Sequence, residues 1–312
     1  MKFEELNELG RRREPFLFIS DFLAQNIQII PLNKLSHADI EFCIDENYTC
    51  RKHGEVFKKY PQSFEIYKKK FDEVIEQIKS GNSYLLNLTA TTPIATDLNL
   101  KEIYKLTNAH YKLRYKDKFV CFSPEKFVQI KDDKIHTYPM KGTIDSSIKD
   151  ATYKILHDEK EMAEHVMVVD LLRNDLSMVA SHVRVEDFRY VKSIDSGEKT
   201  LLHVSSHVSG YVSHEWHSKI GDILSLLLPA GSISGTPKKS TVEIIQKIEN
   251  YDRDFFSGVF GVYDGKSFDS GVMIRFVDKT KDGLVYKSGG GITLDSDAKS
   301  EYNELLDKIY LP

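Results

Sequence analysis

The sequence predicts an α+β fold, in which antiparallel strands form hairpins and helices gather in clusters. Short apolar stretches with an alternating pattern follow one another between residues 119 and 138, and again between residues 255 and 288. The dipeptide Asp264-Gly265 in the second block is typical of a hairpin turn. Stretches with helical spacing do not alternate regularly with single strands, which argues against a βαβ array. The length of 312 residues fits one large domain or two ordinary ones.

The most regular helical pattern covers residues 62–79. Its apolar side chains share one helical face, and Gly81 is a suitable residue to end the helix. Residues 84–92 follow as a predicted strand, which Pro93 is expected to end. Residues 98–112 form a second, weaker helix candidate.

The remaining elements are predicted in the following order. Strands are expected at residues 119–122, 126–130, 134–138, 183–193 and 200–212. Helices are expected at about residues 158–173, 220–228 and 240–249. A strand-rich block then covers residues 255–263, 267–278 and 283–288. The last helix begins after Asp297, a natural N-cap residue, and runs to Ile309.

Composition and charge exclude several functional classes. The net charge of −4, from 43 basic and 47 acidic side chains, gives no reason to expect nucleic-acid binding. No stretch reaches the roughly 18 apolar residues that a membrane helix needs. The three cysteines, Cys43, Cys50 and Cys121, show neither metal-ligand spacing nor a disulfide framework. Without an export signal at the N-terminus, we expect a cytoplasmic protein.

Two pairs of glutamates have a spacing that places carboxylates together. Glu161 and Glu164 are three positions apart on one predicted helix, and Glu301 and Glu304 on another, with Lys308 one turn further. Residues at such spacings share a helical face. If the two faces met, their carboxylates would favour a hard divalent cation such as Mg²⁺. Two solvated helix faces are the alternative interpretation of either pair alone.

Two glycine-rich segments are candidates for anion binding. Gly289-Gly290-Gly291 follows the predicted strand that ends near residue 288, and its backbone N–H groups could approach an anion closely. A flexible turn is an equally good interpretation of the triplet alone. Residues 231–238 form a second glycine-rich turn before a helix, but they lack the G-x-x-x-x-G-K-[ST] pattern of a nucleotide-binding loop.

Taken together, these segments resemble the chorismate-binding enzymes, a family that includes anthranilate, aminodeoxychorismate, isochorismate and salicylate synthases. The similarity runs from about residue 60 to the end of the sequence, and the segments occur in the family's order. They are Phe122-Ser-Pro-Glu125, Pro139-Met-Lys-Gly-Thr143, the segment 163–175 with Glu164 and Asp170-Leu-Leu-Arg-Asn-Asp175, His203-Val-Ser-Ser206, Gly231-Ser-Ile-Ser-Gly-Thr-Pro-Lys238, Ile274-Arg275, Gly289-Gly-Gly-Ile292 and Glu301-Tyr-Asn-Glu304.

The resemblance implies a fold and a domain plan. We expect the family's large layered β-sheet sandwich with helices outside, as a single domain over residues 1–312. Residues 1–60 would be a shortened N-terminal part, and residues 61–312 the catalytic core. Longer relatives carry a tryptophan pocket in the N-terminal region, and we expect that pocket to be absent or incomplete here.

The resemblance also implies a Mg²⁺ site and a substrate site. Glu164 and Glu304 would hold Mg²⁺, with Glu161 and Glu301 acting directly or through its waters, and the cation would polarise the ring system of chorismate. Arg275 would grip the enolpyruvyl carboxylate, because a planar guanidinium suits bidentate binding. Tyr286, Lys308 and the backbone N–H groups of Gly290 and Gly291 would complete that anion site. Further substrate-binding candidates are Gly289, Ser232 and Thr143.

Loss of the ring hydroxyl needs a proton donor, since hydroxide is a poor leaving group. Glu125 matches the family's general acid, a role that requires it to be protonated when it acts. His203 matches a family histidine near the ring, where it would assist orientation or departure of the leaving group. A satisfied structural histidine is the alternative for His203 taken by itself.

Two positions distinguish the members of the family. Isochorismate and salicylate synthases use a lysine base to activate water, and Leu85 stands at that position here. Lys141 lies where anthranilate synthases carry alanine and aminodeoxychorismate synthases carry lysine. A neutral lysine amine can add to ring carbon C2 as the hydroxyl leaves C4, after which ammonia displaces it. The resemblance is therefore greatest to component I of aminodeoxychorismate synthase, which makes 4-amino-4-deoxychorismate for para-aminobenzoate and folate.

The resemblance also implies a partner and leaves two alternatives. No segment reads as a glutaminase, so ammonia is expected from a separate glutamine amidotransferase subunit, and no lyase domain is expected after Pro312. Component I of anthranilate synthase is the first alternative. A catalytically silent, chorismate-binding regulatory subunit is the second.

Overall fold

The computed structural model describes residues 2–44, 57–195 and 200–311. The chain forms two compact units. Unit 1 comprises Met1–Ala38, Pro124–Ser232 and Gly258–Val272, and unit 2 comprises Asp39–Ser123, Ile233–Ser257 and Met273–Pro312. Each unit is built on one antiparallel sheet, so the predicted α+β class is confirmed.

Unit 1 contains a nine-stranded sheet. In order across the sheet, its strands are β10 (Met140–Asp145), β12 (Thr200–Tyr211), β9 (Lys134–Thr137), β8 (Lys126–Lys131), β15 (Phe268–Val272), β14 (Val259–Tyr263), β1 (Phe16–Ser20) and β2 (Ile27–Pro31), while β11 (Ser181–Asp195) pairs with β12. Strand β1 lies between β14 and β2 and is buried at all five positions. The N-terminal residues therefore belong to the core of this unit.

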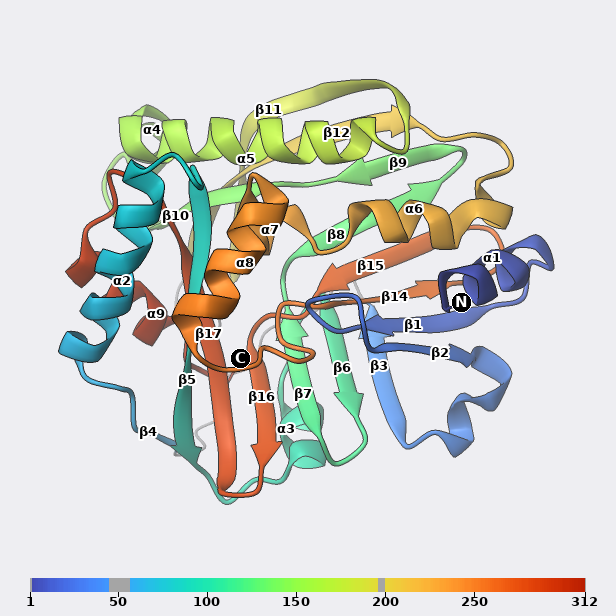
Figure 1. Ribbon diagram of the computed structural model, residues 1–312, viewed down its shortest axis with the longest axis horizontal. Helices are drawn as coiled ribbons and strands as arrows, with labels where there is room; N and C mark the ends of the chain where they lie inside the picture. Colours follow the sequence, from blue (N-terminus) through green and yellow to red (C-terminus); the bar gives the residue numbers. More distant parts are fainter. Residues whose placement is uncertain (1, 45–56, 196–199, 312) are drawn as a thin grey trace. The chain divides into compact units, whose positions relative to one another are not determined.

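The helices described in unit 1 are α1 (Lys2–Arg11), η1 (Leu32–His37), α4 (Ala151–His157), α5 (Glu159–Ser177), η2 (Trp216–Lys219) and α6 (Ile220–Leu227). Helix α1 packs beside α6, and the long helix α5 runs along β11 and β12 (Figure 1). The buried face of α5 includes Val168, Leu172 and Leu176, and the helix packs on β12, in which Val204 and Val208 are completely buried.

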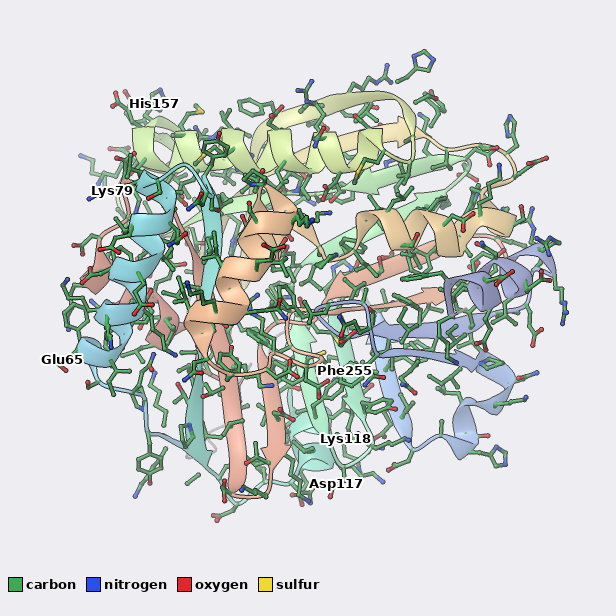
Figure 2. All side chains as sticks on the ribbon, viewed as in Figure 1. Glu65, Lys79, Asp117, Lys118, His157 and Phe255 are labelled. Carbon is green, nitrogen blue, oxygen red and sulfur yellow. The ribbon has the colours of Figure 1, made fainter. Side chains whose placement is uncertain are left out.

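Unit 2 contains an eight-stranded sheet. In order, its strands are β13 (Gly235–Thr236), β5 (Leu85–Ala95), β17 (Gly283–Ile292), β16 (Phe276–Thr280), β7 (Phe119–Ser123), β6 (Tyr111–Tyr115) and β3 (Ile40–Ile44), while β4 (Lys58–Lys59) pairs with β5. Helices α2 (Phe64–Lys79), α8 (Lys238–Glu249) and α9 (Ala298–Asp307) pack at the β5–β17 end, and α3 (Leu100–Leu106) packs on β6 and β7. Figure 2 shows Glu65 and Lys79 at opposite ends of α2. The short α7 (Gly231–Ser234) spans the boundary between the units.

A buried ion pair in unit 2 fixes one edge of β5. Arg253 donates to both carboxylate oxygens of Glu249, over 2.8 and 2.6 Å. Glu249 also accepts from the backbone N–H of Thr89, and Arg253 donates to the carbonyl of Asn87. Because each buried charge is paired and hydrogen-bonded, the pair supplies bonds that a further strand would otherwise supply.

Several predicted elements are confirmed at their expected positions. The helix at residues 62–79 corresponds to α2, with Ser63 as its N-cap and Gly81 after its end at a φ of 74°. The last helix begins after Asp297, whose side chain accepts from the N–H of Ser300. Helix α5 extends four residues beyond the predicted end at residue 173, and α4 was not predicted at all.

The prediction that Pro93 ends its strand is wrong. Strand β5 continues to Ala95, and Pro93 pairs with Val285 of β17. The carbonyl of Pro93 points away from β17 and accepts from the N–H of Tyr60 over 2.9 Å. The missing N–H of proline lies on that same edge, so it removes no bond from the β5–β17 ladder.

Other element boundaries also differ from the prediction. The expected helix at residues 98–112 ends at Leu106, and Tyr111–Tyr115 forms strand β6 instead. The expected strand at residues 267–278 is two strands, β15 and β16, which belong to different sheets. The strand predicted to end near residue 288 continues to Ile292, so the three glycines lie within β17 and not in a turn.

Candidate functional site

Lys141 lies in a β-bulge of the edge strand β10. Met140 pairs with Ser205 and Thr143 with His203, so three steps on β10 face two steps on β12. Such an extra residue bends a strand and redirects its side chains. Gly142, beside Lys141, has a φ of 87°, in the left-handed region that favours glycine. The bulge explains why the motif places a glycine after the lysine.

The bulge presents Lys141 to the carboxylates of α5. Its Nζ atom lies 3.4 Å from Oε2 of Glu164, and Lys160 Nζ lies 3.8 Å from the other oxygen. A Cβ atom at Gly142 would lie 3.2 Å from Oε2 of Glu161. Both predicted carboxylates of this helix therefore lie at the bulge. Asp158 caps the helix start by accepting from the backbone N–H of Glu161.

Two further pairs of predicted residues are in contact within unit 1. The hydroxyl of Thr143 lies 3.0 Å from Nδ1 of His203, its cross-strand neighbour. Ser232 donates a 2.6 Å hydrogen bond to Oε1 of Glu125. Each pair joins residues from different matched segments, separated by 60 and 107 positions.

The sequence interpretation overlooked a buried network behind Lys141. His165 is completely buried, and its Nε2 atom lies 2.7 Å from the hydroxyl of Ser206. That hydroxyl accepts from the N–H of Arg189, while the N–H of Ser206 donates to the carbonyl of Pro139. Burial, reinforced by the charge of Arg189, lowers the pKa of His165 to about 4, so the ring is neutral at pH 7. His165 and Ser206 both stand in matched segments, and this position is the signal in the sequence that could have indicated them.

In unit 2, the triple glycine lies beside a second set of predicted residues, which are Glu301, Glu304 and Lys308. The Thr89 N–H and the Asn87 carbonyl of β5 are bonded to Glu249 and Arg253, so neither faces β17. Because hydrogen-bonded and non-bonded pairs alternate in antiparallel sheets, Gly290 is the glycine that exchanges bonds with β5. The N–H groups of Gly289 and Gly291 point to the other edge. The pairing therefore replaces Gly290 by Gly289 as an expected backbone donor.

Helix α9 places three charged groups over Gly290. A Cβ atom there would lie 3.4 Å from Glu301 Oε2, 3.7 Å from Lys308 Nζ and 3.8 Å from Glu304 Oε1. Lys308 also contacts Glu304 at 2.6 Å and donates to the carbonyl of Gly289 over 2.8 Å. The missing side chain of Gly290 thus leaves the space in which these groups converge. Burial, together with Glu301 and Glu304, raises the pKa of Tyr67 in α2.

Arg275 and Tyr286 are the remaining predicted site residues of unit 2. Arg275 adopts a φ of 52°, and its carbonyl accepts from the N–H of Phe122. Its Nε atom lies 3.5 Å from the hydroxyl of Tyr310. Tyr286 is completely buried and donates its hydroxyl proton to the Tyr310 carbonyl over 3.0 Å. A tyrosine hydroxyl has one proton, so in this arrangement Tyr286 supports the site through Tyr310.

The predicted metal ligands are divided between the units as two pairs. Within either unit, no three or more of the described His, Cys, Asp and Glu side chains are grouped so as to hold a metal ion. The pairs Glu161–Glu164 and Glu301–Glu304 do supply the oxygen ligands that Mg²⁺ prefers. The residue types therefore fit the expected cation.

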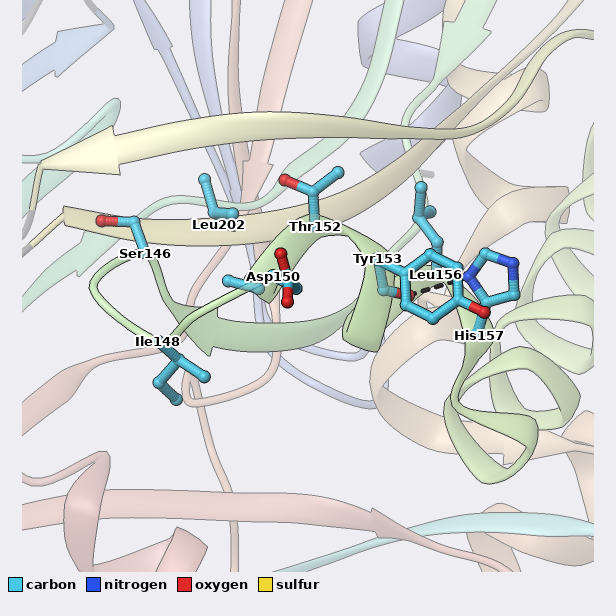
Figure 3. Close-up of a pocket in the computed structure, with 9 residues that line it drawn as sticks. Ser146, Ile148, Asp150, Thr152, Tyr153, Leu156, His157 and Leu202 are labelled. Atoms are coloured by element: carbon cyan, nitrogen blue, oxygen red, sulfur yellow. Dashed lines mark hydrogen bonds between the residues drawn. The ribbon is translucent and has the colours of Figure 1, made fainter.

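A surface pocket in unit 1 lies apart from these residues. It is formed around α4, where the rings of Tyr153 and His157 stack at 3.9 Å (Figure 3). Leu202 of β12 also lines it. None of the predicted site residues lines this pocket.

Comparison with known proteins identifies the family. The model of the chorismate binding enzyme family matches residues 44–311. The chain belongs to the chorismate-binding enzymes. This confirms the resemblance read from the ordered motifs, and it extends the match upstream of residue 60.

The relatives of this chorismate-binding enzyme include an uncharacterised protein and named synthases. The chain is 46% identical to a Haemophilus influenzae protein named "Uncharacterized PabA-like protein", over 99% of this chain and 95% of that protein. It is 30% identical to aminodeoxychorismate synthase component 1 of Bacillus subtilis, over 77% of this chain and 54% of that protein. It is also 30% identical to anthranilate synthase component 1 of Saccharolobus solfataricus, over 78% of this chain and 60% of that protein.

Solved structures confirm the predicted fold. The enzyme superposes on the putative isochorismate synthase DhbC of Bacillus anthracis with a TM-score of 0.71 and 20% identity, over 98% of this chain and 85% of the other. Anthranilate synthase component I of Streptococcus pneumoniae gives a TM-score of 0.69 and 25% identity, over 84% and 60% of the two chains. None of the described helices is long and apolar enough to span a membrane.

Proposed function

We propose that this enzyme aminates chorismate at C4, as component I of an aminodeoxychorismate synthase. The observation that carries the proposal is Lys141, which the β10 bulge holds beside Glu164 in a segment where the anthranilate synthases carry alanine. Leu85 supports it, because a leucine cannot act as the base that activates water. Aminodeoxychorismate synthase and anthranilate synthase relatives both match at 30% identity, so the choice between these two activities rests on Lys141.

The proposed reaction has two displacement steps. The neutral amine of Lys141 adds to C2, the ring double bonds shift, and the C4 hydroxyl leaves as water with a proton from Glu125. Ammonia then attacks C4, the double bonds return, and the C2–N bond to Lys141 breaks. The net change exchanges a hydroxyl for an amino group and involves no oxidation.

The other residues bind and orient the substrate in this proposal. Arg275 and Lys308 bind the enolpyruvyl carboxylate with the N–H groups of Gly289 and Gly291. Ser232 holds Glu125 through the 2.6 Å hydrogen bond, and Thr143 orients His203. Both contacts fix side chains that must face the leaving group.

We propose Glu161, Glu164, Glu301 and Glu304 as the ligands of Mg²⁺. The cation would act as a Lewis acid on the ring carboxylate. Excess EDTA should abolish turnover, and added Mg²⁺ should restore it. Full activity in EDTA would contradict this assignment.

We also propose that a separate glutamine amidotransferase supplies the ammonia. Cys121 is completely buried in β7, and burial raises the pKa of its thiol, so it is unsuited to attack glutamine. Cys50 lies outside the described residues. The purified chain should therefore use ammonium and not glutamine, and glutamine-dependent turnover by the chain alone would contradict this.

The identity of the product tests the central proposal. The enzyme is incubated with chorismate, ammonium and Mg²⁺, with and without an added aminodeoxychorismate lyase. We expect para-aminobenzoate only when the lyase is present. Anthranilate formed without lyase would identify an anthranilate synthase, and unchanged chorismate would favour a silent binding subunit.

A further inference from the structure

The segment that follows α9 contacts Arg275 and Tyr286, two residues predicted to bind the carboxylate of the substrate. Lys308 caps the helix, and the N–H of the next residue, Ile309, donates to the carbonyl of Leu306. Ile309 is buried with 2% exposure, which anchors the segment. Tyr310 then lies 39% exposed, at the surface of unit 2.

The ring of Tyr310 lies against the guanidinium of Arg275. The Cζ atom of Arg275 is 5.6 Å from the ring centroid, within the range of a cation–π interaction. The hydroxyl of Tyr310 adds a contact of 3.5 Å with Nε, at the outer limit of a hydrogen bond. The ring therefore contributes more to holding the guanidinium than the hydroxyl does.

The backbone of Tyr310 holds the second residue of the site. Its carbonyl accepts the 3.0 Å hydrogen bond from the buried hydroxyl of Tyr286. Burial raises the pKa of Tyr286, so the hydroxyl keeps its proton and remains a donor. One residue of the C-terminal segment thus contacts Arg275 with its side chain and Tyr286 with its main chain.

We propose that Tyr310 is a positioning residue that fixes the Arg275 guanidinium for the carboxylate of the substrate. An arginine side chain that is already ordered loses less conformational entropy when the anion binds. The proposal rests on the proposed function, because it takes chorismate as the ligand of Arg275. It adds a residue that lies outside all the motifs matched in the sequence.

Two variants separate the ring from the rest of the residue. Tyr310→Phe keeps the ring and the backbone carbonyl and removes only the hydroxyl. Tyr310→Leu removes the ring and leaves the carbonyl for Tyr286. Tyr60→Leu is the matched control, since Tyr60 is another exposed tyrosine of unit 2, at 56% exposure.

The first measurement does not depend on turnover. In protein labelled with ¹⁵N-arginine, the Nε–Hε signal of Arg275, assigned by its loss in Arg275→Lys, should carry a ring-current shift. We expect the shift to persist in Tyr310→Phe and Tyr60→Leu and to disappear in Tyr310→Leu. An Arg275 signal that is the same in all of these proteins would overturn the positioning role.

The second measurement is steady-state kinetics with chorismate. Tyr310→Leu should raise KM about tenfold, which corresponds to the loss of one cation–π contact, and leave kcat within about twofold. Tyr310→Phe should restore KM to near the wild-type value, and Tyr60→Leu should not change it. An unchanged KM in Tyr310→Leu, or an equal rise in Tyr310→Phe, would contradict the proposal. A wild-type enzyme that does not use chorismate would overturn the proposed function, while the arginine signal would still decide whether Tyr310 fixes Arg275.

Discussion

The Nζ atom of Lys141 lies 3.4 Å from Oε2 of Glu164, across the gap between the β10 bulge and helix α5. The contact joins the residue proposed to attack the substrate to a residue proposed to hold Mg²⁺.

Replacing Lys141 by arginine separates charge from nucleophilicity. Lys141→Arg keeps a cation beside Glu164 but cannot form the adduct, since a guanidinium stays protonated. We expect the variant to fold with an unchanged melting temperature and to lose amination by roughly 10³-fold or more. Comparable turnover by Lys141→Arg would show that the side chain acts only through its charge.

Two alanine substitutions in the triple glycine should affect different properties, one chorismate binding and the other stability. A methyl at Gly290 would make ordinary contacts, at 3.4 Å or more, but would fill the space beneath Glu301 and Lys308. Gly290→Ala should therefore weaken chorismate binding about tenfold with little loss of stability. A methyl at Gly289 would lie 2.5 Å from the carbonyl oxygen of Leu88, so Gly289→Ala should lower the free energy of unfolding by about 1–3 kcal/mol. Urea denaturation and chorismate titration of both variants check this, and a reversal of the two effects would refute it.

The buried network behind Lys141 should be important for stability. His165→Ala leaves a cavity and removes the hydrogen-bond partner of Ser206, so the free energy of unfolding should fall by about 2–4 kcal/mol. His157→Ala, at an exposed position of the neighbouring helix α4, is the control and should change it by less than about 1 kcal/mol. Equal urea midpoints for the two variants would mean that the network contributes little.

Stability should fall in mild acid because of His217. Burial and the nearby Arg13 cation lower the pKa of His217 from 6.5 to about 4. Between these values the unfolded chain takes up a proton that the folded protein does not, so the free energy of unfolding decreases as the pH falls from 6.5 towards 4. His217→Gln removes this titration and should make the slope shallower, while His165, whose pKa is also about 4, continues to contribute. An unchanged slope in urea titrations of this variant would contradict the assignment.

Local patterns predicted much of the fold. Helix α2 has a continuous apolar stripe, a serine cap and a terminal glycine, all of which are encoded within 20 consecutive residues. The division of residues 267–278 into β15 and β16 could not be predicted in this way. Both strands have apolar patterns, and the crossing from one sheet to the other at Met273–Arg275 depends on which distant strands each one pairs with.

The candidate site was predictable as a set of residues but not as an arrangement. The motifs supplied Lys141 and Glu164, yet their contact depends on a bulge whose register is set by β12. His165 stands in a matched segment, but nothing in the sequence indicates its contact with Ser206. Tyr310 carried no signal, because its role arises from contacts with residues 24 and 35 positions away.

Intact-protein mass spectrometry of the enzyme with chorismate and Mg²⁺, without ammonium, tests the nucleophile most directly. We predict a covalent adduct with the mass of chorismate less water, present in wild type and in Lys160→Ala, absent in Lys141→Ala, and discharged when ammonium is added. Lys160 is the matched control because it contacts the same carboxylate as Lys141. An adduct that persists in Lys141→Ala, or C4 amination by that variant at the wild-type rate, would contradict the account.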